Sequence, residues 1–218
     1  MPARGLDPSG IILVDKPAGP SSFAIVASVR RKTGARTGHA GTLDPFATGL
    51  LLLLSGASTR LQPHFVGLDK RYVTEIDLSA RTSTADPEGD VFDEHDPPEL
   101  DELEERLHEL RGVVELPIPA ASAVKIGGER AYRLHRRGVA VEMPVRRTHV
   151  RELRLEEYLD GIARLDLLVS SGTYVRAIAD SLGGHCRALR RTEIGPFAVE
   201  EADPEKIIPP EVALARLG

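Results

Sequence analysis

Cysteine is almost absent from the sequence, and so are long apolar runs. The single cysteine, Cys186, excludes an intrachain disulfide and any metal site built from several cysteines. No apolar run approaches the roughly 20 residues that span a bilayer, and the N-terminus lacks a secretory apolar segment. We therefore expect a cytoplasmic protein with no membrane partner. At 218 residues, of which 41% are hydrophobic, the chain can bury one large core or a core plus a small appendage.

An overall excess of positive charge is also absent, because the formal net charge is -5 at pH 7. The charge is unevenly distributed along the chain. Residues 86–115 contain thirteen acidic residues and two arginines, a net of -11, so the rest of the chain carries +6. Basic residues cluster at 30–36, 125–154 and 187–191. Such patches are compatible with binding a phosphate backbone on one face, although solvated surface charge gives the same pattern.

The most distinctive stretch is GHAGTLDPFATG at residues 38–49, which holds three glycines, a proline, a histidine and an aspartate. Glycine lets the backbone approach another surface closely or adopt positive φ, and Pro45 biases Asp44 away from helical dihedrals. We therefore expect Asp44 to be presented on a rigid turn. From spacing alone, a structural turn in which Asp44 bonds its own backbone is the commoner outcome, and a functional carboxylate is the alternative.

Apolar patterns predict the strands. The expected strands are residues 11–14, 50–54, 72–79, 150–158 and 162–170. The five leucines at 50–54 are typical of a strand that is buried on both faces. Asp160 and Gly161, between the last two strands, are a strong hairpin signal. Tyr72 shares the apolar face of its strand, where a core tyrosine is the usual outcome.

Helices are expected at residues 21–32, 96–112 and 130–137, and in the segment that carries Arg176. Ser21 or Ser22 can cap the first helix, and Thr173 can cap the last. The helix at 96–112 is acidic, with leucines at three- and four-residue spacing. Residues 56–68 are expected to form an irregular connection in which Pro63 interrupts or kinks any helix.

Residues 38–49 match every fixed position of GH-x-G-x-LDP-x-ATG, the signature of the TruB-type pseudouridine synthases, and the chain resembles this family throughout. The other motifs follow in order: KPxGxSS at 16–22, DKxY at 69–72, RTDTxDxxG at 81–89, SAxKxxGxRAY at 122–132, SxGTYxR at 170–176 and LRRTxxGPF at 189–197. Ser83 replaces an aspartate of the third pattern, and residues 117–121 depart from the family's Pro-Pro-x-Tyr-Ser. The chain is also shorter than most relatives between Leu182 and Leu189.

The resemblance implies roles for individual residues. Asp44 is the implied catalytic nucleophile, Tyr72 contacts the target base, and Arg176 pairs with Asp44. His39 is expected to occupy the stack that the flipped base leaves. The remaining residues expected to bind RNA are Lys16, Lys70, Lys125, Arg130, Arg133, Arg136, Arg137, Leu189, Arg190 and Arg191.

The resemblance also implies an α+β fold, with a mixed, largely antiparallel sheet flanked by helices and a basic insertion over the active cleft. A catalytic domain at 1–203 is expected to contain this mobile RNA-binding insertion at about 117–147. Residues 204–218 are expected to be a short tail, so the chain resembles a short form without the family's C-terminal PUA-type RNA-binding domain.

The implied reaction is isomerisation of uridine to pseudouridine at position 55, in the T-loop of tRNA, after the base is flipped out. No cofactor or metal is expected, the T-arm of tRNA is the expected partner, and the protein is expected to act as a monomer. An aspartate can attack either C6 of the base or C1 of the ribose, and both routes stay open. A module that binds and folds tRNA without chemistry is the first alternative. A hydrolase that uses Asp44 and His39 is the second alternative, but the sequence shows no nucleophilic serine motif or set of metal ligands to accompany these two residues.

Overall fold

The computed structural model describes residues 9–218 of the chain. The strands are β1 (Gly10–Lys16), β2 (Thr37–His39), β3 (Thr48–Ser55), β4 (Lys70–Asp77), β5 (Ala80–Thr82), β6 (Val91–Glu94), β7 (Gly112–Pro117), β8 (Lys125–Ile126), β9 (Glu129–Arg130), β10 (Val145–Leu159), β11 (Ile162–Val169), β12 (His185–Ile194) and β13 (Phe197–Ala198). The helices are α1 (Ser22–Thr33), α2 (Gln62–Val66), α3 (Leu100–Glu109), α4 (Ala131–Arg136), α5 (Val175–Ser181) and α6 (Pro210–Ala215), with the 3-10 helices η1 (Gly56–Leu61) and η2 (Val199–Glu201).

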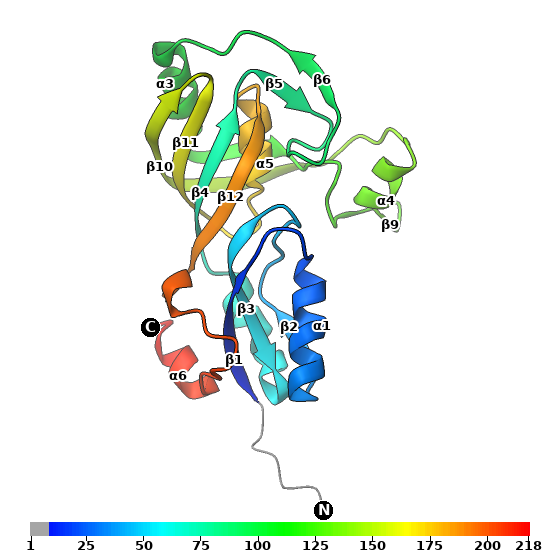
Figure 1. Cartoon of the computed structure of the whole chain (residues 1–218), viewed down its shortest axis with the longest axis vertical. Coiled ribbons are helices and arrows are strands. Elements are labelled where there is room, and N and C mark those ends of the chain that lie inside the picture. The colour runs from blue at the N-terminus through cyan, green and yellow to red at the C-terminus, as the bar shows by residue number, and fades with distance from the viewer. Residues whose placement is uncertain (1–8) are drawn as a thin grey trace, which may run out of the picture. The chain divides into compact units, whose positions relative to one another are not determined.

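The main sheet has the strand order β1-β3-β12-β4-β11-β10-β7, with β2 paired to β3 and β13 to β12 (Figure 1). The pairs β1–β3, β7–β10 and β10–β11 are antiparallel, whereas β3–β12 is parallel. This arrangement confirms the mixed, largely antiparallel α+β fold. Within residues 9–218, none of the helices combines the length and apolarity that crossing a bilayer requires.

The described residues form two compact units. The first contains the chain up to Val73 together with Leu189–Gly218, and the second contains Thr74–Ala188. Strands β4 and β12 contribute residues to both units. The expected division into a catalytic domain at 1–203 and a tail at 204–218 stays a prediction.

In the first unit, β1 and β3 form an antiparallel pair that is covered on both faces. One face belongs to a core cluster with Phe65 of α2 and Phe197 of β13. The other face packs against Val26 and Val29 of α1. The leucines at 50–54 alternate between the two clusters and are all fully buried, so the strand expected from them is confirmed.

Both ends of α1 are capped, and the cap at its start is the one predicted. The Ser21 hydroxyl accepts a hydrogen bond from the backbone N–H of Ala24 at 3.2 Å. Gly34 closes the helix with φ of 67°, and its N–H donates to the carbonyl of Arg30 at 2.9 Å. A left-handed residue at this position suits glycine because it has no Cβ.

The connection after β3 is more regular than expected. The 3-10 helix η1 continues directly into α2, and Pro63 occupies the first turn of α2. The helix type changes from 3-10 to α immediately before Pro63, and a proline in the first turn removes no intrahelical hydrogen bond. Pro63 therefore helps to start α2.

Residues 204–218 are part of the first unit, where they pack against β1. Ile11 and Ile208 exchange backbone hydrogen bonds of 2.9 and 2.8 Å. Ala213 of α6 is fully buried in the core cluster that contains Ile11. This end of the chain therefore contributes to the hydrophobic core of its unit.

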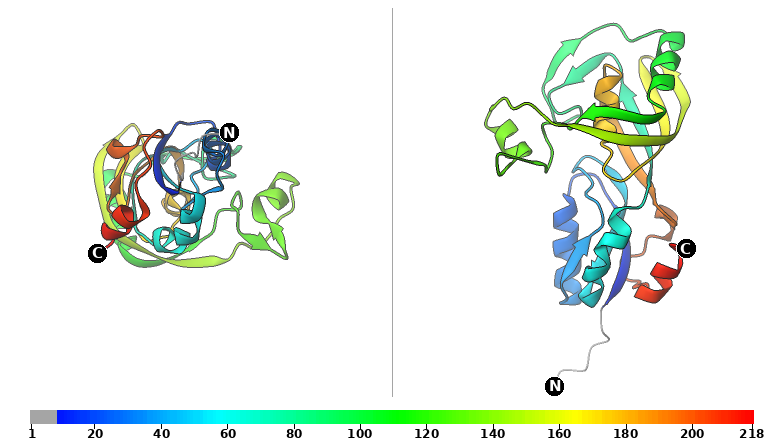
Figure 2. Two further views of the ribbon diagram at one scale, coloured as in Figure 1. Left: turned by 90° about the horizontal axis from the view of Figure 1, so that it is seen from below. Right: turned by 180° about the vertical axis from the view of Figure 1, so that it is seen from behind.

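The second unit is built on β10, which pairs with β7 on one side and β11 on the other (Figure 2). Asp160 and Gly161 connect β10 to β11 with φ of 50° and 74°, so the predicted hairpin is confirmed. Alternate residues Leu165, Leu167 and Val169 of β11 are buried, as the sequence predicts.

The acidic helix is shorter than expected. Helix α3 begins at Leu100 because Pro97 and Pro98 keep the preceding residues out of the helical region. Leu103 and Leu107 are buried, and the acidic residues line the opposite face. Gly112, with φ of 85°, leads the chain into β7.

Candidate active site

Asp44 lies in the loop between β2 and β3 of the first unit, and the backbone on both sides of it is fixed. The Ser22 hydroxyl donates to the carbonyl of Leu43 and accepts from the Leu43 N–H, both at 2.8 Å. The Pro45 carbonyl accepts from the Gly19 N–H at 2.8 Å. Asp44 is half-buried, whereas Leu43 is buried. The rigid turn expected from the sequence is therefore present, and Asp44 is held in it half-buried.

Lys16 of β1 holds this loop through hydrogen bonds to its backbone. Its side chain is fully buried, and its ammonium donates to the carbonyls of Pro17 at 2.8 Å, Pro45 at 3.1 Å and Ala47 at 2.7 Å. Bonds from a charged donor are stronger than neutral ones, so the three contacts hold the segment around Asp44. Lys16 was expected to bind RNA, but its burial instead favours a positioning role.

Arg191 holds the other side of the loop. Strand β12 runs parallel to β3, with Arg191 opposite Gly49. Its guanidinium is buried and donates to the carbonyls of Leu50 at 2.7 Å and Gly41 at 3.1 Å. A Cβ at Gly49, where φ is 102°, would lie 2.2 Å from the Arg191 carbonyl oxygen, so only glycine fits. Arg191, like Lys16, was expected to bind RNA, but its burial favours a positioning role.

Lys70 and His39 lie within the electrostatic influence of Arg191. Burial, with a smaller contribution from the Arg191 charge, lowers the pKa of Lys70 to about 8, and the Asp69 charge opposes this shift. The Lys70 ammonium donates to the carbonyls of Val66 at 2.6 Å and Leu68 at 2.5 Å, so Lys70 too is a buried support.

His39 ends strand β2 and is half-buried. Burial lowers the pKa of its imidazole, and the Arg191 charge lowers it again. Its Nδ1 accepts a hydrogen bond from the Gly41 N–H at 3.3 Å, which fits a neutral ring protonated on Nε2. A neutral imidazole is suited to stacking among nucleobases.

Three more predicted site residues lie in the first unit. Tyr72 and Leu189 are 8% and 7% exposed, on β4 and β12. The Arg190 guanidinium binds both oxygens of the Asp15 carboxylate, at 3.0 and 2.7 Å. Arg190 must exchange this partner to bind a phosphate.

Arg176 lies at the start of α5 in the second unit, where it is 2% exposed. Its Nη1 lies 3.1 Å from Oδ2 of the buried Asp86 and donates to the Thr84 carbonyl at 2.7 Å. Nη2 donates to the Ala121 carbonyl at 2.9 Å. The pairing of Asp86 with Arg176 was not predicted from the sequence, although Asp86 is the second aspartate of the RTDTxDxxG pattern.

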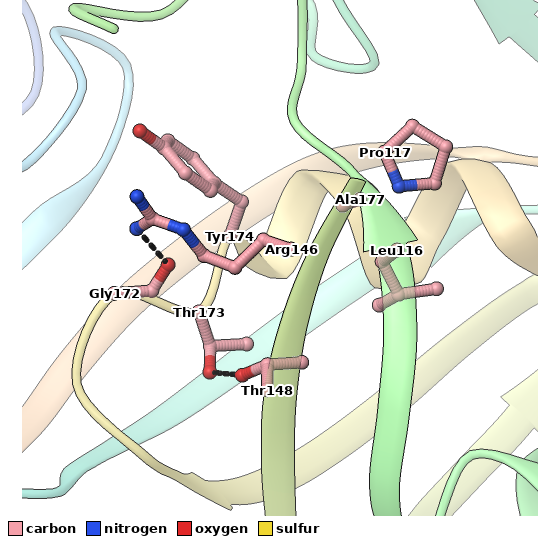
Figure 3. A pocket seen from close by; sticks show the side chains of 8 residues that line it. All are labelled: Leu116, Pro117, Arg146, Thr148, Gly172, Thr173, Tyr174 and Ala177. Carbon is pink, nitrogen blue, oxygen red and sulfur yellow. Dashed lines mark hydrogen bonds between the residues drawn. The ribbon is translucent and has the colours of Figure 1, made fainter. Parts of the chain in front are cut away.

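The turn before α5 differs from the expected cap. Tyr174 occupies the N-cap position with no side-chain cap bond, and the Thr173 hydroxyl donates to the Ser170 carbonyl at 2.9 Å and contacts Thr148. Arg146 donates to the Gly172 carbonyl at 3.1 Å and lies over the Tyr174 ring, 5.8 Å from its centroid (Figure 3). A small pocket lies here, and the residues that line it are Leu116, Pro117, Arg146, Thr148, Gly172, Thr173, Tyr174 and Ala177.

The basic segment between β7 and β10 carries the other predicted RNA contacts. Helix α4 places Arg133 and Arg136 beside the Tyr132 ring, 5.9 and 5.7 Å from its centroid. Arg137 pairs with Glu129 at 2.9 Å. The remaining members are the exposed Lys125, and Arg130, which donates to the Ala123 carbonyl. Residues 9–218 contain no group of three or more His, Cys, Asp or Glu side chains placed to share a metal ion.

Comparison with known proteins identifies the family. The description "TruB family pseudouridylate synthase (N terminal domain)" matches residues 30–175. The chain belongs to the TruB family. A tRNA pseudouridine synthase B from Leifsonia xyli subsp. xyli is 42% identical over 226 residues, covering 96% of this chain and 75% of the relative. A tRNA pseudouridine synthase B from Thermobifida fusca is 40% identical over 214 residues, covering 88% and 72%.

Solved structures agree with this membership of the TruB family. A crystal structure of a Cbf5-Nop10-Gar1 complex matches 91% of this chain with a TM-score of 0.67 and 26% identity. This chain spans 55% of that solved chain.

Proposed function

We propose that this protein isomerises uridine to pseudouridine at position 55, in the T-loop of tRNA, with Asp44 as the catalytic carboxylate. Membership of the TruB family supports the reaction, and the names of its curated relatives support tRNA as the substrate. One structural observation carries the role of Asp44. The loop on both sides of Asp44 is fixed through Ser22, Lys16 and Arg191, yet Asp44 itself is only half-buried.

The reaction breaks the bond between N1 and the sugar, turns the ring, and joins C5 to the same carbon. The C5 proton is then lost and N1 is protonated, so no electrons are gained or lost. The Asp44 carboxylate supplies the nucleophile that either C6 of the base or C1 of the ribose requires. Arg176 is proposed to be the cation that keeps Asp44 ionised, a role for which a guanidinium is better suited than an ammonium. Tyr72 is proposed to contact the base and assist removal of the C5 proton.

The target base must leave its stack before Asp44 can reach it, which costs a few kcal/mol. His39 is proposed to occupy the vacated position, because its lowered pKa favours a neutral aromatic ring. The exposed Lys125, Arg130, Arg133 and Arg136 are proposed to contact phosphates. A tRNA substrate would place this reaction in the cytoplasm.

The test is release of tritium from a tRNA transcript that carries uridine labelled at C5, followed by mapping of the modified nucleotide. Asp44→Asn should bind tRNA and release no tritium, because the amide keeps the shape of the side chain but removes the nucleophile. Asp203→Asn, at an exposed position, is the matched control and should retain turnover. Turnover by pure Asp44→Asn would overturn the catalytic role. Parental protein that binds tRNA without releasing tritium would instead support a folding module.

A further inference from the structure

The outward-facing side of α1 has features that the proposed reaction does not use. Phe23 is 76% exposed, the largest exposure among the large hydrophobic side chains of the described residues that are found at the surface. Phe23, Ala27 and Arg30 are four and three residues apart, so they lie on one stripe of the helix. Arg31 adjoins this stripe, and we call these four residues the outer face of α1. Figures 1 and 2 show no other described element of the first unit outside this helix.

The charged residues of α1 itself are all positive. The sequence of the helix, SFAIVASVRRKT, contains no acidic residue, and Arg36 follows its end. Lys32 pairs with Glu205 at 2.8 Å. Within residues 9–218, Arg30, Arg31 and Arg36 form no ion pair, in contrast to Arg154, Arg164 and Arg216, which pair with glutamates at 3.5, 2.9 and 2.7 Å. Three arginines that have no anionic partner in the described part of the chain favour a polyanionic ligand.

The position of α1 relates this face to Asp44. Ser22, the residue before Phe23, makes both hydrogen bonds to Leu43, the residue before Asp44. The Phe23 end of α1 therefore adjoins the Asp44 loop within the first unit. Arg30 lies about 10 Å farther along the helix axis, at about 1.5 Å per residue. That distance corresponds to roughly three nucleotide steps along one strand of a duplex, and to fewer steps along an extended single strand.

We propose that the outer face of α1, with Arg36, is a second RNA-contact surface of the TruB-type site. Phe23 stacks on an unpaired base near the target uridine, and Arg30, Arg31 and Arg36 bind phosphates of the nucleotides that lead away from it. An exposed aromatic ring beside a row of cations is the combination that binds single-stranded nucleic acid. This proposal rests on the proposed function, because it takes the substrate to be RNA.

The stacking contact can be measured directly because the sequence contains no tryptophan. Phe23→Trp introduces a single indole, whose fluorescence should be quenched when tRNA is added. The tRNA concentration at half-maximal quenching should equal the concentration at half-maximal binding. Phe92→Trp, at a position that is 61% exposed in the second unit, is the matched control and should respond little. Phe23→Ala should weaken tRNA binding at least about five-fold. The stacking contact would be refuted if tRNA did not quench the fluorescence of Phe23→Trp and Phe23→Ala bound tRNA with the affinity of the parental protein.

The phosphate contacts can be measured from the dependence of tRNA affinity on salt concentration. Each contact contributes a slope of about -0.7 to -0.9, so Arg30→Gln/Arg31→Gln/Arg36→Gln should flatten the slope by about two to three. Arg154→Gln/Arg164→Gln/Arg216→Gln removes the same charge at paired positions and should change the slope by less than about one. Equal slopes for these two triple variants would overturn the proposed surface. Failure of the parental protein to release tritium would count against the proposed function and not against this surface.

Discussion

Removal of the Asp86 charge should destabilise the protein, because Asp86 and Arg176 are both almost fully buried. Their side chains are 5% and 2% exposed, and Oδ2 lies 3.1 Å from Nη1. In Asp86→Asn, Oδ1 still accepts from the Thr84 hydroxyl at 2.5 Å and the Glu88 N–H at 3.0 Å. The amide nitrogen, however, replaces the oxygen that faces the guanidinium, and two donors then oppose each other.

Loss of one partner of a buried ion pair costs about 3–5 kcal/mol. Arg176 keeps its bonds to the carbonyls of Thr84 and Ala121, so the cost should lie near the lower end of that range. A loss of about 3 kcal/mol should lower the melting temperature of a chain of this size by about 6–12 °C. Urea unfolding followed by far-ultraviolet circular dichroism measures the free energy of unfolding.

A double-mutant cycle isolates the pair. Arg176→Met and Asp86→Asn should together cost less than the sum of the single variants, by at least about 1 kcal/mol. Asp180→Asn is the control in the same unit, because Asp180 accepts from Arg81 at 2.7 Å but the two side chains are 40% and 35% exposed. That exposed pair should contribute less than about 1 kcal/mol. Single variants that add within about 0.5 kcal/mol, or an equal loss in Asp180→Asn, would refute the reasoning.

Three further predictions concern titration, catalysis and RNA contact. Lys70 has a pKa of about 8 in the folded protein against 10.5 as its ordinary value, so the unfolded chain binds more protons between these values. Stability should therefore rise with pH across that window, and urea titrations should show a flatter rise for Lys70→Met. Arg176→Lys should lose nearly as much tritium-release activity as Arg176→Ala, because one ammonium cannot replace a guanidinium that donates through both Nη1 and Nη2; near-parental turnover would make Arg176 a general cation. Arg133→Gln/Arg136→Gln should flatten the salt dependence of tRNA affinity by about 1.5, and Arg137→Gln alone should change it less because Glu129 already pairs with Arg137; an unchanged slope in the double variant would exclude α4 from the interface.

The sequence by itself determined the features that depend on neighbouring residues. Strand β3 was predictable because five consecutive leucines have no polar residue to place on a solvent face. The hairpin at Asp160 and Gly161 was predictable because both residues tolerate positive φ. The motif at 38–49 located Asp44 and the family, since its glycines and proline restrict the local backbone. The resemblance to the TruB family is confirmed.

Only the tertiary structure decided the environment of the cations. Lysine and arginine are usually found at protein surfaces, yet Lys16, Lys70 and Arg191 are all buried. Arg191 bonds the carbonyls near Asp44 only because β12 pairs with β3, two strands separated by more than a hundred residues. No local pattern records that pairing. Charged side chains enter a core only where carbonyls or carboxylates from distant segments can replace water, and only the folded chain supplies those partners.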